Sequence, residues 1–212
     1  MAIQSSLKNM VLVLTGTCLV CSALLGGAYV MTKDPIAAAE QAKTVKALAN
    51  VLPEGCDEIA TEPETVEVDG VCYHYYVARK GGEVAGYAIE SSTGGFGGEL
   101  VVMVGIDAAT GFICNTTPLR HNETPGLGAK CNDEESAFRS QWVGLNPQEH
   151  NFAVKQDIDA ITASTITSTA YTKCVTQALA AYAAIAAAVP AEEPVIPSEV
   201  EESETMEEPS NE

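Results

Sequence analysis

The stretch ETVEVDGVCYHYYVARKGGEVAGYAIESS, residues 64–92, gives the clearest strand pattern in this 212-residue chain. It alternates polar residues with valine, tyrosine and other side chains that favour strands. Asp69-Gly70 and Lys80-Gly81-Gly82 interrupt the alternation, and such residues form tight hairpin turns between antiparallel strands. The stretch therefore predicts strands on both sides of each turn.

The next segment, GELVVMVGIDAATGFICNTTPL, residues 98–119, extends the same pattern. Two more strands are expected around the turn at Ala109-Thr110-Gly111, since apolar and β-branched residues lie on both sides of it. Together the two segments predict an antiparallel sheet of four or five strands.

Helical patterns lie before and after these strands. Asp34-Pro35 is a typical helix start, and good helix formers follow it until Pro53. A second helix is expected in residues 133–145, where Phe138 and Trp142 share a face, and a third from Thr169 to about Val189. The order of helix, strands and helices predicts an α+β domain, not a parallel doubly wound sheet.

An apolar segment precedes the first of these helices. Residues 10–31 carry no charge and are bounded by Lys8 and by Lys33-Asp34. As a helix they would reach about 33 Å, which spans a bilayer. The apolar part of a cleaved signal peptide is shorter, about 7–15 residues. A retained membrane anchor is therefore the better interpretation, although the flanking charges do not fix its orientation.

The formal net charge of −18 is concentrated at the other end of the chain. Residues 191–212 contain nine glutamates and no basic residue, and prolines interrupt them. This composition predicts a disordered acidic tail. The chain has no basic patch with interleaved aromatic residues, which argues against nucleic-acid binding.

The seven cysteines do not form a metal-binding pattern. Cys18 and Cys21 make a CxxC pair inside the apolar segment, and the other five are scattered without ligand spacing. Small buried apolar side chains are the expected role, with no metal site. A disulfide such as Cys114 to Cys131 stays open.

Three short segments are candidates for a binding site. SSTGGFGGE, residues 91–99, precedes a strand, so it suits a bulge or a close approach of another group better than a phosphate loop. RHNETPGLGAK, residues 120–130, places Leu127 between two glycines, where an apolar side chain could lie against a flat ring. DAITASTITSTAY, residues 159–171, gathers hydroxyls before a helix. They either cap that helix or hold a phosphate at its N-terminus.

These motifs, in this order, resemble a known family. Residues 36–175 resemble the FMN-binding domain of the G subunit of Rnf complexes and of the C subunit of the sodium-translocating NADH:quinone reductase. The membrane anchor, the GYA strand at residues 86–88, the glycine-rich loop, ETPGLG at residues 123–128 and the alcohol run carry the resemblance.

The resemblance implies a covalently bound cofactor. In this family the last hydroxyl of a D-x-x-[S/T]-G-A-[S/T] motif is esterified to the phosphate of FMN by a dedicated flavin transferase. The matching residues run from Asp159 to Thr165, so Thr165 is the implied attachment residue and Asp159 the implied recognition residue for the transferase. Ala163 and Ser164 depart from the family's glycine and alanine, and Ala163 lacks the freedom of glycine to adopt positive φ.

The resemblance also implies the surroundings of the flavin. The ETPGLG loop packs beside the isoalloxazine ring in the family, and three alcohols near Thr165 are expected around the phosphate. The residues implied are Glu123, Thr124, Gly126, Leu127 and Gly128 for the ring, and Thr162, Ser164 and Thr167 for the phosphate. No catalytic residue and no metal ligand is expected.

The expected role is that of a membrane-anchored electron carrier in an Rnf-type ion-translocating ferredoxin:NAD oxidoreductase. Its partners would be the other membrane subunits and the flavin transferase, with the FMN domain on the outer side of the cytoplasmic membrane. The expected parts are a cytoplasmic end (1–9), an anchor (10–31), the FMN-binding domain with its juxtamembrane helix (32–189) and the acidic tail (190–212). The C subunit of the quinone reductase and a non-redox anchored binding protein remain alternatives.

Overall fold

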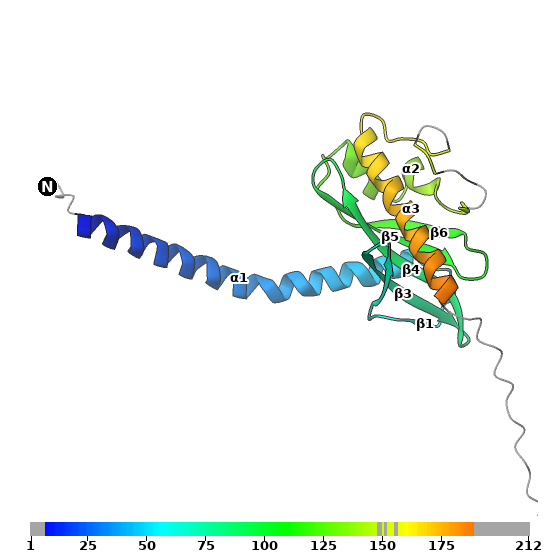
Figure 1. The fold of residues 1–212 in the computed structure, drawn as a ribbon, viewed down its shortest axis with the longest axis horizontal. Helices are drawn as coiled ribbons and strands as arrows, with labels where there is room; N and C mark the ends of the chain where they lie inside the picture. Colours follow the sequence, from blue (N-terminus) through cyan, green and yellow to red (C-terminus); the bar gives the residue numbers. More distant parts are fainter. Residues whose placement is uncertain (1–6, 148–149, 151, 155–156, 189–212) are drawn as a thin grey trace, which may run out of the picture.

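The computed structural model describes residues 7–147, 150, 152–154 and 157–188. The acidic tail expected at residues 190–212 lies outside the described residues, as does most of the expected cytoplasmic end. Figure 1 shows a long helix that leads into a domain of strands and further helices. In chain order the elements are α1 (Leu7–Val51), β1 (Glu58–Ile59), β2 (Glu64–Val68), β3 (Val71–Lys80), β4 (Glu83–Gly94), β5 (Glu99–Asp107), β6 (Ile113–Arg120), the 3-10 helix η1 (Gly128–Asn132), α2 (Ala137–Ser140) and α3 (Thr165–Ala188).

The sheet is antiparallel throughout, in the order β1-β3-β4-β5-β6, with β2 also paired to β3. The expected hairpins are confirmed: Asp69 and Gly70 have φ of 53° and 78°, and Gly81 and Gly82 have φ of 62° and 89°. The expected count of four or five strands is wrong, since the sheet has six strands. The additional pairing comes from the two-residue β1, which is too short to leave a pattern in the sequence.

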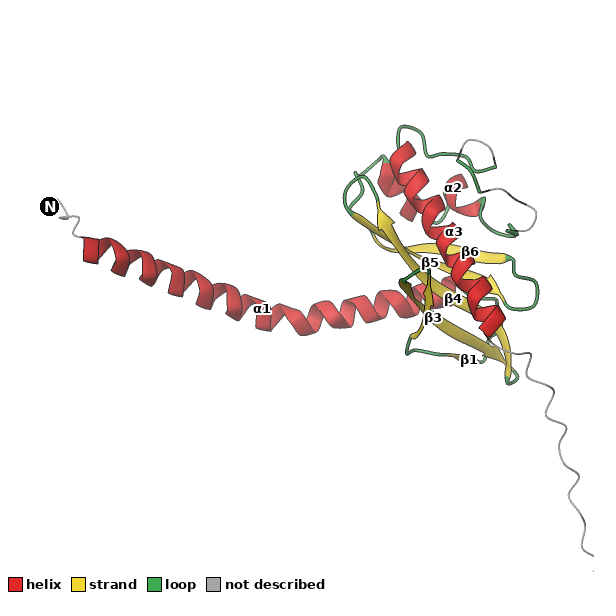
Figure 2. Cartoon of the chain, viewed as in Figure 1, coloured by secondary structure: helices red, strands yellow, loops and turns green. Residues whose placement is uncertain are grey.

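Helices cover both faces of the sheet, which makes the fold α+β as expected (Figure 2). On one face, Val102 and Val104 of β5 join a large core with α3, α2 and η1. On the other face, Met103 joins a smaller core with the last turn of α1. Because β5 is buried on both faces, its sequence is a nearly continuous apolar run.

The anchor and the juxtamembrane helix form one continuous helix, α1, with Pro35 inside it. The expected helix start at Asp34-Pro35 is therefore wrong. A proline in a helix removes one hydrogen bond and bends the helix without necessarily ending it, and Figure 1 shows α1 bent along its length. Within the described residues, α1 is the one helix long and apolar enough to cross a membrane, and its apolar part is unburied.

The end of α1 lies directly on the sheet. A side chain at Gly105 would overlap the carbonyl group of Val51, and one at Gly86 would come within 2.9 Å of the Pro53 ring. The two glycines therefore allow the backbone after the helix to approach β4 and β5. This close packing attaches the domain to α1.

The other two helices differ in length from the sequence prediction. The helix expected in residues 133–145 is reduced to one turn, α2, although the Phe138 and Trp142 rings do meet, with centroids 6.1 Å apart. Helix α3 begins at Thr165, four residues before the expected start at Thr169. Hydroxyls in its first turns donate back to carbonyl groups four residues earlier, so these residues fit inside the helix.

All seven cysteines are free thiols, and no group of three metal-ligating side chains occurs in the part of the chain that the structure describes. Burial raises the pKa of Cys114 to about 11, and nearby Asp107 and Cys56 add to this shift. Burial also raises the pKa of Cys131 to about 11, with Glu123 adding to the shift. The two thiols have different neighbours, and the Cys114–Cys131 disulfide left open by the sequence is not formed.

Candidate functional site

Three segments that are distant in sequence meet at one cavity of about 360 Å³ beside the start of α3. They are the loop between β4 and β5, the loop between β6 and η1, and the turn that enters α3. The cavity is lined by Phe96, Glu123, Thr124, Leu127, Gly128, Ala163, Ser164, Thr165, Ile166 and Thr167.

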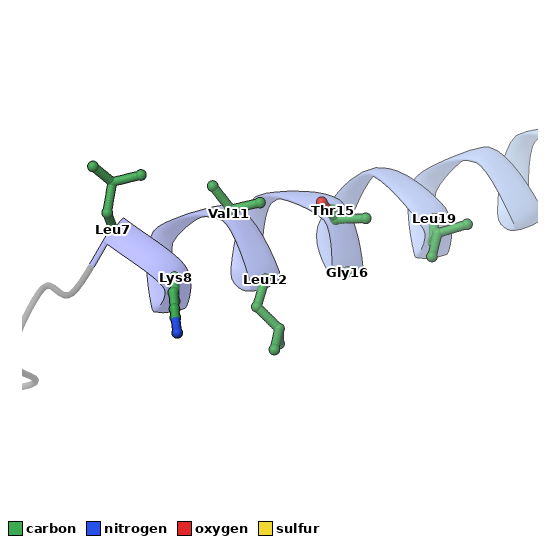
Figure 3. Close-up of a pocket in the computed structure, with 7 residues that line it drawn as sticks. All are labelled: Leu7, Lys8, Val11, Leu12, Thr15, Gly16 and Leu19. Carbon is green, nitrogen blue, oxygen red and sulfur yellow. The ribbon is translucent and has the colours of Figure 1, made fainter.

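A larger hollow, about 650 Å³, lies along the first turns of α1 (Figure 3). Its lining comes from this helix alone: Leu7, Lys8, Val11, Leu12, Thr15, Gly16 and Leu19. A single helix face cannot enclose a ligand, and a membrane-spanning helix would turn this face toward lipid or another helix. The cavity at the start of α3 is therefore the candidate site.

The first turn of α3 supplies donors to this cavity. The Ser168 amide donates to the Ser164 carbonyl over 3.0 Å, so the helical hydrogen bonding starts at Ser164. The amide groups of the first turn of α3 therefore have no hydrogen-bond partner within the helix, and the helix dipole adds a partial positive charge there. An anionic group, above all a phosphate, is favoured at such a position.

The hydroxyls of the alcohol run differ in exposure. Thr167 and Ser168 are buried, and both are hydrogen-bonded inside the protein. Thr165 is exposed and lines the cavity, whereas Thr162 is exposed but does not line it. Within residues 162–171, Thr165 is therefore the alcohol that is both accessible and directed to the site. The alternative that these hydroxyls precede α3 as caps does not hold for Thr167 and Ser168, which lie inside the helix.

The turn before α3 holds Ala163 in the left-handed region, with φ of 62°. The Ser164 amide donates to the Ile161 carbonyl over 3.0 Å, and the Ile161 amide donates to the Ser168 hydroxyl over 2.9 Å. These bonds attach the turn to α3 and fix its backbone. The site therefore requires positive φ at a position where the side chain disfavours it.

We expect the substitution Ala163→Gly to stabilise the protein by about 1 kcal/mol, because glycine adopts positive φ without a Cβ clash. Urea unfolding of the full chain in detergent, followed by circular dichroism, measures this. The matched control is Ala180→Gly on the exposed face of α3, which should destabilise by about 1 kcal/mol. A loss of stability in Ala163→Gly as large as in the control would contradict the prediction.

Glu123 is buried at the centre of the site. Its Oε1 atom accepts hydrogen bonds from the backbone amides of Phe96, over 2.8 Å, and Gly97, over 3.3 Å. Its Oε2 atom accepts one from the Thr167 hydroxyl over 2.5 Å. One carboxylate thus connects all three segments that form the cavity.

The close approach expected at the glycine-rich loop is confirmed, and the approaching groups belong to the protein. A side chain at Gly95 would overlap the Glu123 carboxylate, and one at Gly97 would overlap the Asn122 carbonyl group. A side chain at Gly128 would come within 2.6 Å of both Glu123 and Thr167. Glycine is therefore required at all three positions for the segments to come together.

Three large apolar side chains line the cavity and remain exposed. Phe96 is 66% exposed, Ile166 57% and Leu127 43%, and each comes from a different segment. Exposed apolar groups that line one cavity are typical of a ligand site for a flat, partly apolar molecule. An apolar wall beside an anion-binding helix start suits a ligand with a ring and a phosphate.

The structure brings most of the predicted site residues together. Seven of them line the cavity: Glu123, Thr124, Leu127, Gly128, Ser164, Thr165 and Thr167. Gly126 is not among the lining residues and forms a turn with φ of 77°, and Thr162 lies in the turn before α3. Asp159 is exposed, and its backbone exchanges two hydrogen bonds with the Gln141 side chain.

Sequence reasoning missed Phe96, Ala163 and Ile166 as lining residues. The signal for Phe96 was present, since it is the one apolar side chain in a run of glycines. Ile166 had no such signal. The direction of its side chain depends on where α3 begins, and the predicted start at Thr169 is four residues after the observed start at Thr165.

The FMN-binding domain family matches residues 95–180. This range contains all the residues that line the cavity. The G subunit of the Na(+)-translocating ferredoxin:NAD(+) oxidoreductase complex of Acetobacterium woodii is 38% identical over 115 residues, which cover 50% of this chain and 54% of that protein. The G subunit of the proton-translocating ferredoxin:NAD(+) oxidoreductase complex of Clostridium ljungdahlii is 30% identical over 180 residues, which cover 83% of this chain and 91% of that protein.

A solved structure is also similar. The C subunit of the Na(+)-translocating NADH-quinone reductase from Parabacteroides distasonis matches with a TM-score of 0.43 and 23% sequence identity. The match covers 54% of this chain and 63% of that chain.

Proposed function

The chain belongs to the family of the G subunit of ion-translocating oxidoreductase complexes, and from this premise we propose that it carries electrons through an FMN bound covalently to Thr165. The complex would be an Rnf-type ferredoxin:NAD oxidoreductase, as the names of the relatives indicate. When bound, FMN supplies one-electron redox chemistry, and the protein sets its position and surroundings.

The observation that carries the proposal is the place of the Thr165 hydroxyl. It is exposed, it lines the cavity, and it belongs to the first residue of α3. The free amides of the first turn would hold the phosphate beside it. Ser164 and Thr167 also line the cavity and would complete the polar surroundings of the phosphate.

Attachment requires a transfer of the flavin-bearing phosphate. The Thr165 oxygen would form a bond to the phosphorus of an activated flavin donor, while the bond from that phosphorus to the donor's leaving group breaks. The hydroxyl proton is lost in the same reaction. The flavin transferase would bind the exposed turn before α3, where Asp159 is accessible.

The apolar wall of the cavity would pack against the ring of the flavin. Phe96, Leu127 and Ile166 would contact the isoalloxazine, with Thr124, Gly126 and Gly128 shaping the loop around it. The phosphate ester is remote from the ring in the FMN molecule. The redox potential would therefore be set by these neighbours and by their exclusion of water.

Helix α1 supports a membrane location. Residues 10–31 would form the anchor, residues 32–189 the FMN-binding domain with its juxtamembrane helix, and residues 190–212 the acidic tail. We place the FMN domain on the outer side of the cytoplasmic membrane, where free FMN is scarce and a covalent link prevents loss of the cofactor. The other membrane subunits of the complex would donate and accept the electrons.

Expression of the full chain in a host with a flavin transferase tests the proposal. We expect a denaturing gel to show a fluorescent band under ultraviolet light, and intact-mass analysis to show the addition of one FMN with loss of one water. An unmodified mass for protein from its native host would contradict the covalent carrier. It would leave a non-redox anchored binding protein as the alternative.

A further inference from the structure

We propose that Glu123 is a positioning residue that clamps the phenylalanine loop, residues 95–98, to the start of α3 and does not itself bind the flavin. The consequence of the clamp for the flavin rests on the proposed function. The structural part of the proposal concerns the protein alone, because every group in the clamp belongs to this chain.

The first half of the clamp holds the phenylalanine loop. Oε1 of Glu123 accepts hydrogen bonds from two consecutive amides, those of Phe96 and Gly97. The loop also has its own bond, from the Gly95 amide to the Gly98 carbonyl over 2.7 Å. Glu123 thus fixes the backbone at Phe96, and with it the position from which the Phe96 side chain extends.

The second half holds α3. Oε2 accepts from the Thr167 hydroxyl, which is only 1% exposed and lies in the same helix as Thr165 and Ile166. A hydrogen bond from a hydroxyl to a carboxylate is short and strong. The clamp therefore fixes the distance between the two sides of the cavity that bear Phe96 and Ile166.

Both oxygens of the carboxylate are engaged in these bonds, so none points unpaired into the cavity. Within the described residues, the ion pair found is Arg120 with Glu99, and Glu123 is balanced by amide and hydroxyl donors. The clamp thus depends on acceptor geometry more than on pairing with a cation. Glutamine would preserve it, since its carbonyl oxygen accepts from the amides and its NH₂ group donates to the Thr167 oxygen.

The glycines around Glu123 support the same role. Gly95, Gly97 and Gly128 each leave space that a side chain would take from Glu123, Asn122 or Thr167. The glycine-rich loop is thus shaped around a protein carboxylate. Its sequence resembles that of a ligand-binding loop because a protein carboxylate and a bound ligand both need free space beside the backbone, which glycine provides.

The first test uses the full chain without flavin, as Thr165→Ala. Hydrogen exchange measured by mass spectrometry reports the protection of residues 95–98. With Glu123→Ala we expect exchange in this loop to rise about tenfold, since bonds to a charged acceptor are lost. With Glu123→Gln it should stay close to the parent. Equal protection in the alanine variant would overturn the clamp.

The second test uses the flavin-loaded chain and measures visible circular dichroism per attached flavin. This signal reports how well the ring is ordered, whereas the covalent link retains the flavin in either case. We expect Glu123→Ala to lose most of the signal and Glu123→Gln to keep it. A fall in the glutamine variant equal to that in the alanine variant would show that the charge matters and not the clamp.

If Glu123→Ala does not attach flavin, a matched pair of variants at Thr167, the other end of the clamp, still tests the proposal. Thr167→Val removes the hydroxyl donor and should weaken the signal, whereas Thr167→Ser should preserve it. Glu135→Ala, an exposed carboxylate outside the cavity, is the neutral control. Absence of flavin from the wild-type chain would reject the proposed function, and the exchange experiment would still decide the clamp.

Discussion

The Thr165→Ala chain should contain no covalent flavin. Thr165 supplies the one oxygen of the alcohol run that is exposed and lines the cavity, so its removal leaves no nucleophile in place. We expect the fluorescent band on a denaturing gel to fall below detection, and the intact mass to equal that of the bare chain. The fold should persist, because the Thr165 side chain is exposed and its loss leaves no cavity in the core.

Three further variants give this prediction its controls. Thr165→Ser keeps a hydroxyl on the same helix position and should retain attachment. Thr162→Ala and Thr169→Ala remove exposed hydroxyls on either side and should also retain it, since neither residue lines the cavity. Persistent fluorescence in Thr165→Ala, or loss only in one of the neighbours, would assign the attachment to another residue.

The largest effect on stability is expected at Trp142. This side chain is fully buried and contacts the rings of Phe138, Phe152 and Tyr171 at centroid distances of 5.8–6.1 Å. Truncation to alanine would leave a large cavity between α2 and α3, and such changes cost about 3–5 kcal/mol. We therefore expect Trp142→Ala to lose most of the stability of the domain.

Urea unfolding of the full chain in detergent, followed by circular dichroism, measures this loss. Trp142→Phe is the matched control, because it keeps an aromatic ring in the cluster and also removes the indole N–H, which has no partner in its buried position. It should cost clearly less than the alanine variant. Equal losses in the two variants would show that the indole itself, and not the filled volume, is essential.

The sequence was a good guide wherever one physical signal determined the structure. Asp69-Gly70 and Gly81-Gly82 specify hairpins because few other residues adopt positive φ at both positions. The apolar run from Leu100 to Val104 predicted a strand, and the structure shows that this strand is buried on both faces. The alcohol run and the ETPGLG loop were both predicted as candidate segments, and the structure places residues of both at one cavity.

Helix boundaries were less predictable, because competing local signals decide them. Pro35 resembles a first helical residue, yet it lies within α1, where helix formers on both sides continue the helix. Threonine and serine favour caps in isolation, yet Ser168 and Thr169 lie inside α3 and bond back to its carbonyl groups. Around Pro35, where α1 is exposed, the helix formers on both sides outweigh the proline, whereas the buried Ser168 is held in the helix by packing against the domain.

The role of Glu123 was beyond sequence reasoning for a different reason. Its partners, Phe96 and Thr167, are 27 and 44 residues away in the chain. Only the fold brings them together, and no short-range pattern records such a contact. The positive φ of Ala163 was indicated only by the glycine that the resembling family has at this position, since the alanine itself gives no sign of it.

The packing of α1 against Gly105 has a consequence for how the protein meets its partners. With residues 10–31 in a bilayer, the helical residues from 32 to 46 would raise the domain about 22 Å above the lipid. Because the end of the helix is fixed against β5, the domain cannot rotate freely about a flexible tether. The domain would then be held at one height and in one orientation, and a partner protein that binds it would have to extend about that far from the membrane surface.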